Sequence, residues 1–416
     1  MRHSRFAVLL LAVLTAACGN GVEQPETEEH ASVATLAEAI VPPPLTAEMP
    51  DCERAGVHDS GYVVYVVTDR SCASGGPRRV FSLGPKGAGA AVQLDMQEGD
   101  EIDNITIPSL GVRRVGLYRA GQWRRIDNAD SWQHRDGPGL LLLNGELYLL
   151  GGWLWGPTSS EVWKTRDLVH WEYLGDAPWP ARHGAGWVVH KDRLYVVGGD
   201  WMRDTWSSAN GIDWVQHSVT SPFGTLYTPN AVSLDGKIVL YGGQGGTEGV
   251  NAVWESSDGS EWKLLQGNAP WAGRGLVHGG AVHSGRIHLV GGGVKAVPPG
   301  QSSSETKQEF SDIWSSSDGI DWRIEADTLG FVPRTHFSLV ATPRGCYVSD
   351  GSVGIQAAVS NALFHAPDCV HFAPVPDPPP LQPRHASALT FFNGSLVILG
   401  GPPASDAGTT VWQYFP

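Results

Sequence analysis

Short apolar segments that end in two glycines recur along the chain. The clearest is Leu194-Tyr-Val-Val-Gly-Gly199, which is followed by Trp206 and Trp214. Other copies of this order, some of them weaker, have their second glycines at Gly152, Gly243, Gly292, Gly351 and Gly401. The steps between successive second glycines are 47, 44, 49, 59 and 50 residues. A period of about 40 to 50 residues with such glycines and tryptophans predicts the blades of a β-propeller, which are small sheets that must stack around an axis to bury their apolar faces.

Each repeat carries the signals of a four-stranded antiparallel blade. The run before the glycines is apolar, as a buried strand should be. Two later strands each carry a tryptophan and are joined by Asn210-Gly211, Asp258-Gly259 or Asp318-Gly319. These dipeptides favour tight hairpins because both residues can adopt positive φ. We expect the second tryptophan to pack between neighbouring blades, and we predict an all-β chain.

The number of blades depends on how the residues before the clear repeats are interpreted. The repeats cover residues 127–416, whereas residues 51–126 match poorly. We interpret residues 51–126 as a degenerate first blade, which gives seven blades; six blades with an N-terminal cap is the alternative. The last repeat ends soon after Trp412, so a segment within Ala31–Ile40 is expected to add its outermost strand and remove an exposed sheet edge.

The N-terminus has the pattern of an export signal. In residues 1–17, Arg2 and Arg5 precede an apolar run that is too short to span a membrane as a mature helix. The segment that ends at Cys18 resembles a bacterial lipoprotein signal, which implies lipidation of Cys18 and a membrane anchor. Thr15 departs from that pattern, and an ordinary signal peptide with a stray cysteine is the alternative. Residues 18–50, which are acidic and contain prolines, are expected to form a tether.

Cysteine count and charge narrow the class of protein further. The four cysteines that remain after Cys18 suggest two local disulfides, Cys52–Cys72 and Cys346–Cys369, as expected in an oxidising compartment; four buried thiols are the alternative. The formal net charge is −14. An acidic chain argues against a nucleic-acid partner, which requires a basic face.

The repeat resembles a known family. The order Gly-x-Leu-Tyr-Val-x-Gly-Gly, then Val-Trp-x-Ser-x-Asp-Gly-x-x-Trp, is similar to the bacterial kelch-type repeat, whose members include propellers like the central domain of galactose oxidase. The resemblance implies a kelch-type propeller over roughly residues 130–416. A copper site like that of galactose oxidase is not expected, because it needs a free cysteine cross-linked to a tyrosine. No cofactor and no metal are predicted.

Arginines and histidines recur where a propeller exposes the mouth of its channel. Arg135, Arg182, Arg334 and Arg384 lie 17 residues before the second glycine of their repeats, and Arg274 lies 18 before. The accompanying histidines are His183, His278, His336 and His385, with His134 beside the first arginine. A ring of arginines would suit a carboxylate or phosphate. The competing interpretation is that repeated residues tie one blade to the next.

Other residues offer weaker functional signals. Trp153, Trp155 and Trp201 follow double glycines and are candidates for an exposed aromatic rim, which marks binding rather than catalysis. Asp136 and Glu248 are possible general bases. No nucleophile elbow or phosphate-binding loop is present.

These features favour a binding module over an enzyme. We expect a monomeric, exported, lipid-anchored propeller that binds a protein or an anionic carbohydrate at the cell envelope. The alternative is a mutarotase-, epimerase- or lyase-like enzyme that acts on acidic sugars at the channel mouth.

Overall fold

A computed structural model describes two units of the chain, residues 1–120 and 121–416. The described residues are strand segments between 52 and 126 and residues 132–416, apart from 247, 297–305, 355–357, 377–378 and 402–409. The signal segment, Cys18, the tether and Cys72 lie outside them. No helix in this described part is long and apolar enough to cross a membrane.

The first unit contains two small antiparallel sheets. The larger has the order β1-β2-β3-β4, and β5 pairs with β6. The bounds are Cys52–Asp59, Tyr62–Asp69, Arg78–Leu83, Gly89–Leu94, Ile105–Ile107 and Val112–Val115. The propeller described below closes with six blades, and none of them contains these strands. The prediction of a seventh, degenerate blade over residues 51–126 is therefore wrong.

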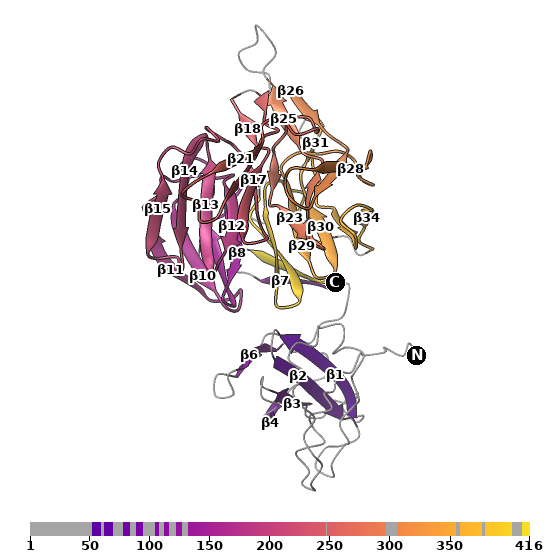
Figure 1. Ribbon diagram of the computed structural model, residues 1–416. Coiled ribbons are helices and arrows are strands. Elements are labelled where there is room, and N and C mark those ends of the chain that lie inside the picture. The colour runs from indigo at the N-terminus through magenta and orange to yellow at the C-terminus, as the bar shows by residue number, and fades with distance from the viewer. Residues whose placement is uncertain are drawn as a thin grey trace, which may run out of the picture. The chain divides into compact units, whose positions relative to one another are not determined.

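The second unit is a propeller of six four-stranded antiparallel blades (Figure 1). Blade 1 consists of β8–β11, at Gly139–Leu143, Glu146–Leu150, Glu161–Thr165 and Trp171–Asp176. Blade 2 consists of β12–β15, at Gly186–His190, Arg193–Gly199, Met202–Ser208 and Trp214–Ser218. Blade 3 consists of β16, β17, β20 and β21, at Asn230–Leu234, Lys237–Tyr241, Val253–Ser256 and Lys263–Gln266.

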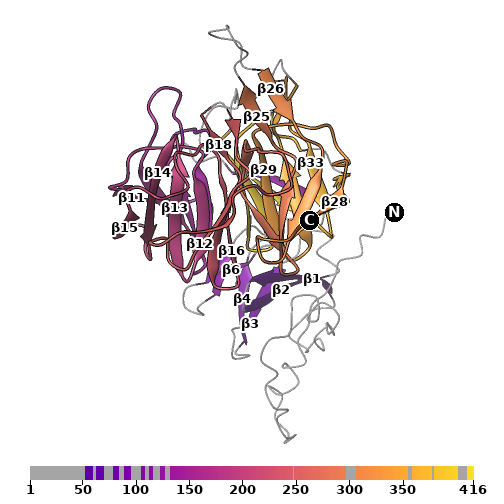
Figure 2. The ribbon, with the colours of Figure 1, turned by 45° about the horizontal axis from the view of Figure 1, so that its top comes forward.

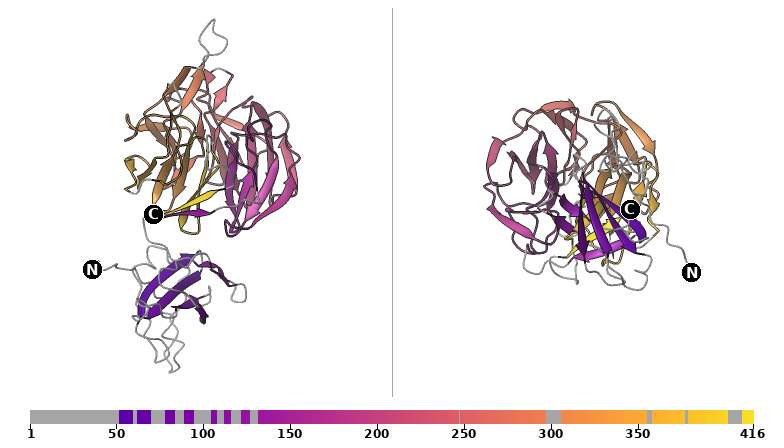
Figure 3. Two further views of the ribbon diagram at one scale, coloured as in Figure 1. Left: turned by 180° about the vertical axis from the view of Figure 1, so that it is seen from behind. Right: turned by 90° about the horizontal axis from the view of Figure 1, so that it is seen from below.

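The remaining blades complete the circle seen along its axis in the right-hand view of Figure 3. Blade 4 consists of β23, β24, β27 and β28, at Ala281–His283, Arg286–Val290, Ile313–Ser316 and Trp322–Ala326. Blade 5 consists of β29, β30, β33 and β34, at Phe337–Thr342, Gly345–Ser349, Leu363–Ala366 and Ala373–Pro374. Blade 6 consists of β35–β37, at Ala388–Phe392, Ser395–Leu399 and Val411–Phe415, together with β7. The blade count is the predicted alternative of six rather than seven.

The outermost strand of blade 6 comes from the start of the second unit. β7, at Gln122–Ile126, pairs antiparallel with β37, so that Trp412 lies opposite Arg125. A strand from before the repeats was expected to complete the last blade, but the segment was wrong: it is Gln122–Ile126 and not Ala31–Ile40. The two ends of the propeller are thereby held in one sheet, which leaves no unpaired edge on β37.

The tryptophans fill the spaces between blades, as predicted. Trp214 of blade 2 contacts Trp179 edge-on, with ring centroids 5.7 Å apart, in a cluster that also contains Leu143 of blade 1. Trp322 of blade 4 contacts Trp271 edge-on and packs against Tyr241 in a tilted arrangement. Each such ring buries a large apolar area, so the interfaces between blades form the core.

The hairpin turns differ in one detail from the prediction. In blade 3, Gly259 has φ 84°, but Asp258 does not have positive φ. The Asp258 carboxylate instead accepts the N–H of Ser260 at 2.9 Å, and Ser256 Oγ accepts the N–H of Gly259 at 2.8 Å. A Cβ on Gly259 would lie 2.8 Å from Thr205 of blade 2. The glycine is therefore required by the next blade as well as by the turn.

Blade 5 has lost its tryptophans and contains a disulfide instead. Phe364 and Phe372 stand where other blades have tryptophan, and they pack in one cluster with Cys346 and Cys369. Cys346 and Cys369 are disulfide-bonded, as predicted. The other predicted pair, Cys52–Cys72, includes a residue outside the described part.

Three short hairpins extend the connections between the second and third strands of blades 3 to 5. They are β18–β19 at Gln244–Gly245 and Glu248–Gly249, β25–β26 at Gly293–Ala296 and Thr306–Glu309, and β31–β32 at Ser352–Val353 and Ala358–Val359. The first two project from the same end of the propeller (Figure 2). That end also holds the loops that precede the innermost strands.

Candidate functional site

A closed ring of hydrogen bonds joins the six blades at the end where the innermost strands begin. Each blade has one residue with φ between 48° and 60° there, namely Gly137, Gly184, Thr228, Leu276, His336 and Ala386. The N–H of each donates to the preceding residue of the ring, at 2.6–2.9 Å, and Gly137 closes the circle by donating to Ala386. Thr228 accepts through its hydroxyl, and the others accept through backbone carbonyls. We call this end of the channel the mouth.

Four ring members are not glycine, although positive φ is unfavourable for residues with a side chain. Such a conformation persists where its surroundings hold it in place. Here the surroundings are the neighbouring blades. The ring therefore gives the mouth a fixed geometry on which side chains can be positioned.

The predicted arginines lie inside the blades. Arg135, Arg182, Arg274, Arg334 and Arg384 are at most 3% exposed. Arg182 is typical: it donates to the carbonyls of Pro180 and Gly198 and forms a two-pronged pair with Asp204 at 2.6 and 2.8 Å. Arg135 pairs with Glu161 and Arg274 with Asp312. This placement favours the interpretation that the arginines hold each loop to the double glycine of its own blade.

The side chains at the mouth come from two positions that vary between blades. One directly follows the arginine position, where the residues are Asp136, His183, Tyr227, Gly275, Thr335 and His385. The other directly follows the double glycine, where the described residues are Trp153, Asp200, Gln244, Gly293 and Ser352. Backbone bridges join the two positions in blades 1, 3, 4 and 5. The repeated positions build the blades, whereas the residues at these two positions differ from blade to blade.

Aromatic rings form a continuous surface across blades 1 to 3. Trp155 lies 4.8 Å from Trp153, which lies 6.5 Å from His183, measured between ring centroids. His183 is 5.3 Å from Tyr227, and Tyr227 stacks on Trp201 at 5.5 Å. We call these five residues the aromatic platform. Trp155 and Trp201 are 54% and 42% exposed, and both have φ 62°, so two large rings are held in solvent at some conformational cost.

Hydrogen bonds fix the centre of the platform. The Nδ1 atom and the backbone N–H of His183 both lie 2.8 Å from the carboxylate of Asp200. The Tyr227 hydroxyl lies 3.2 Å from Nε2 of His183. A carboxylate at Nδ1 favours the tautomer with the proton on that nitrogen, so the Tyr227 hydroxyl donates to Nε2. The imidazole is thus oriented from both sides.

Asp136 is an acid at the mouth with a raised pKa. Burial raises the pKa of Asp136 to about 6, although the charges of His183 and Lys295 oppose this. Its Oδ2 lies 3.9 Å from Nε2 of His385. Its Oδ1 is buried and has no hydrogen-bond partner among the described residues. Asp136 therefore changes between its protonated and ionised forms at about pH 6.

Three histidines from blades 4 to 6 approach one another at the mouth. The rings of His278 and His336 are 6.0 Å apart, and those of His336 and His385 are 5.6 Å apart. Burial lowers the pKa of His278 to about 3, helped by the charges of His183 and His385, so this imidazole is neutral at ordinary pH. Within the described ranges, no group of three His, Cys, Asp or Glu side chains is arranged to hold a metal ion.

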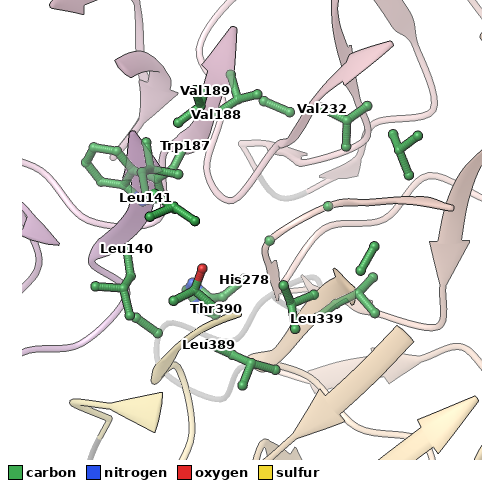
Figure 4. A pocket seen from close by; sticks show the side chains of 18 of the residues that line it. Leu140, Leu141, Trp187, Val188, Val189, Val232, His278, Leu339, Leu389 and Thr390 are labelled. Atoms are coloured by element: carbon green, nitrogen blue, oxygen red, sulfur yellow. The ribbon is translucent and has the colours of Figure 1, made fainter. Parts of the chain in front are cut away.

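Inside the mouth, the innermost strands surround a cavity of about 360 Å³. Figure 4 shows Leu140, Trp187, Val232, Leu339 and Leu389 around it, together with His278. Most of the labelled side chains are apolar. Of the groups with perturbed pKa values described above, His278 lines this cavity and Asp136 does not.

Sequence reasoning found part of this site. It named Trp153, Trp155, Trp201 and the histidines, and it raised Asp136 as a possible base. It missed Asp200 and Tyr227. The signal was available, because Tyr227 occupies the place of His183 in the next repeat and Asp200 directly follows a double glycine, as Trp153 does.

Neither models of known protein families nor curated proteins gave a match to this chain. The kelch resemblance therefore rests on the repeat motif itself.

Proposed function

We propose that this protein is an exported, lipid-anchored binding module that holds a saccharide on the aromatic platform. The observation that carries the proposal is the exposure of Trp155 and Trp201 on a surface shared by three blades. In this proposal residues 1–17 direct export, Cys18 carries the lipid, and residues 18–50 tether the propeller at the cell envelope.

The chemistry of the platform suits a sugar ring. The faces of tryptophan and tyrosine offer a large apolar area next to a polar group, which is the combination typical of small-molecule sites. Asp200 and Asp136 lie beside the platform and can accept hydrogen bonds from ligand hydroxyls. Both are acids, so a neutral sugar is a better fit here than an anionic one.

The test is binding of neutral hexose oligosaccharides to the purified full-length protein by calorimetric titration. We expect Trp155→Ala and Trp201→Ala each to weaken binding about tenfold, since a ring contact contributes roughly 1 to 1.5 kcal/mol. Tyr173→Ala is the matched control, because Tyr173 is 47% exposed on β11 and is not part of the platform. Binding that is weakened equally by all three changes would exclude the platform.

Asp136 supports a second candidate, a sugar-directed epimerase, mutarotase or lyase. A carboxyl with its pKa near 6 can both give and take a proton near neutral pH. If the protein turns over a bound sugar, Asp136→Asn is expected to lower kcat at least about 100-fold while sugar binding is retained. A sugar that binds the wild type without any chemical change in it over days would exclude this candidate.

A further inference from the structure

Blade 5 retains an arginine whose acidic partner is missing. In blades 1, 2 and 4 the acid stands two residues before the first tryptophan, as Glu161, Asp204 and Asp312. In blade 5 the same position is Ala362, two residues before Phe364.

Blade 3 shows what happens when the pair is lost as a whole. There the arginine position is Leu226 and the acid position is Ala252. In blade 5 only the acid has gone, and blade 6 shares this feature, since it keeps Arg384 and has Thr410 two residues before Trp412.

The hydrogen bonds of Arg334 leave part of its guanidinium unused. Within the described part of the chain it donates to the carbonyl of Val332 at 3.1 Å through Nε and to that of Asp350 at 2.9 Å through Nη1. In blade 2 the equivalent Nη1 and Nη2 also hold both oxygens of a carboxylate. Among the described residues, Nη2 of Arg334 has no such acceptor.

Neighbouring groups compensate the charge of Arg334 only in part. The guanidinium carbon lies 5.2 Å from the ring centroid of Phe331 and 5.1 Å from that of Phe364. Rings attract a cation but offer it no hydrogen-bond acceptor in the plane of the guanidinium. The carboxyl groups of Asp350 and Glu309 act on it through their charge, but in the described part of the chain neither carboxyl accepts a hydrogen bond from Arg334. Burial lowers the pKa of Arg334, as it does for the buried and paired Arg135.

We propose that Arg334 binds the carboxylate of a small acidic ligand, such as a uronic acid, in the space that an aspartate would occupy at position 362. A planar carboxylate matches the fork of a guanidinium. The ligand oxygens would accept from Nη1 and Nη2, as Asp204 does from Arg182 in blade 2. The phenyl rings of Phe331 and Phe364 would border the ligand.

Solvent reaches this position in the other blades. The paired acids there keep 10–27% of their side chains exposed. Ala362 is itself partly exposed, and Val332, whose carbonyl accepts from Arg334, is 59% exposed. This anion site lies in blade 5, across the ring from blade 2, and is distinct from the aromatic platform.

The test is titration of the full-length protein with sodium acetate and with sodium glucuronate at low ionic strength, with glucose as the uncharged probe. We expect saturable binding of both anions and a rise in melting temperature by mass action. Ala362→Asp supplies the missing carboxylate internally, as in blades 2 and 4. It should raise the melting temperature without ligand and weaken anion binding at least tenfold.

Two further variants keep the test decisive. If Ala362→Asp does not fold, Ala362→Glu takes its place in the test. This variant copies Glu161 of blade 1 and should likewise raise the melting temperature without ligand and weaken anion binding. Ala252→Asp adds an acid at the matching place in blade 3, where Leu226 offers no cation, and should leave acetate binding unchanged. The proposal is overturned if the wild type shows no saturable response to either anion, or if the response survives an acid at position 362. Trp201→Ala should retain acetate binding, because Trp201 belongs to the aromatic platform and not to the anion site. The saccharide proposal and the anion proposal can therefore fail independently of each other.

Discussion

Replacing Arg182 with leucine is expected to destabilise the protein by about 3 to 5 kcal/mol, the usual cost of leaving a buried charge without its partner. Arg182 is fully buried, and its two-pronged pair with Asp204 links the mouth loop to β14. Burial alone would raise the pKa of Asp204, but hydrogen bonds and charge from Arg182 hold it below its usual value. Without Arg182, that largely buried carboxylate keeps hydrogen bonds from the Trp206 indole and from its own backbone N–H but loses its cation. Urea unfolding at neutral pH measures the change in the free energy of unfolding.

The chain contains its own control for this prediction. Blade 3 has Leu226 and Ala252 in the places of Arg182 and Asp204 and still forms four paired strands. The double variant Arg182→Leu with Asp204→Ala should therefore recover most of the lost stability, because replacing a buried pair as a whole is often close to neutral. The double variant could instead be as unstable as Arg182→Leu alone. The loss of stability would then come from the missing hydrogen bonds to Pro180 and Gly198, and not from the unpaired Asp204 carboxylate.

The architecture could be predicted from the sequence because one local pattern is used six times. Trp214 and Trp322 mark the interfaces between blades, and double glycines such as Gly198-Gly199 mark the turns beside them. The blade count could not be settled in the same way. Strand-like runs such as Tyr62–Asp69 carry no information on their partners, and the closing strand Gln122–Ile126 is recognised only by its pairing with β37.

The candidate functional residues, unlike the residues that define the blades, do not repeat along the chain. The arginines attracted attention because they repeat, and repetition turned out to accompany burial within the blades. Asp200 and Tyr227 escaped notice because each occurs once. A site at a propeller mouth is assembled from single residues of different blades, and the sequence separation between Trp153 and Tyr227 hides their proximity until the ring is closed.

Replacing Asp350 with asparagine is expected to reduce the decrease in the free energy of unfolding that the wild type shows as the pH rises from about 4 to about 8. Asp350 is 1% exposed, and its Oδ1 has no hydrogen-bond partner among the described residues, while Ser387 donates to Oδ2. Burial raises the pKa of Asp350 to about 8, against hydrogen bonds from Ser387 and the charges of Arg384 and Arg334. In the unfolded chain an aspartate titrates near about 4. Between these two pH values the folded state keeps the proton and the unfolded state loses it, so stability falls as pH rises and levels off above the folded pKa.

The comparison of wild type and Asp350→Asn isolates this group, because other titrating residues such as Asp136 are common to both proteins. Each unit of separation between the folded and unfolded pKa corresponds to about 1.4 kcal/mol, so the difference at pH 8 should reach several kcal/mol.

Asparagine tolerates the φ of 57° at this position, and Asp350→Gly restores the glycine that other repeats have there. Both variants should be more stable than the wild type at pH 8 in urea unfolding, whereas Asp350→Ala should gain less because alanine is strained at that φ. If the stability curves of wild type and Asp350→Asn ran parallel from pH 5 to pH 8.5, Asp350 would be ionised throughout, and its charge would already balance Arg334 and Arg384.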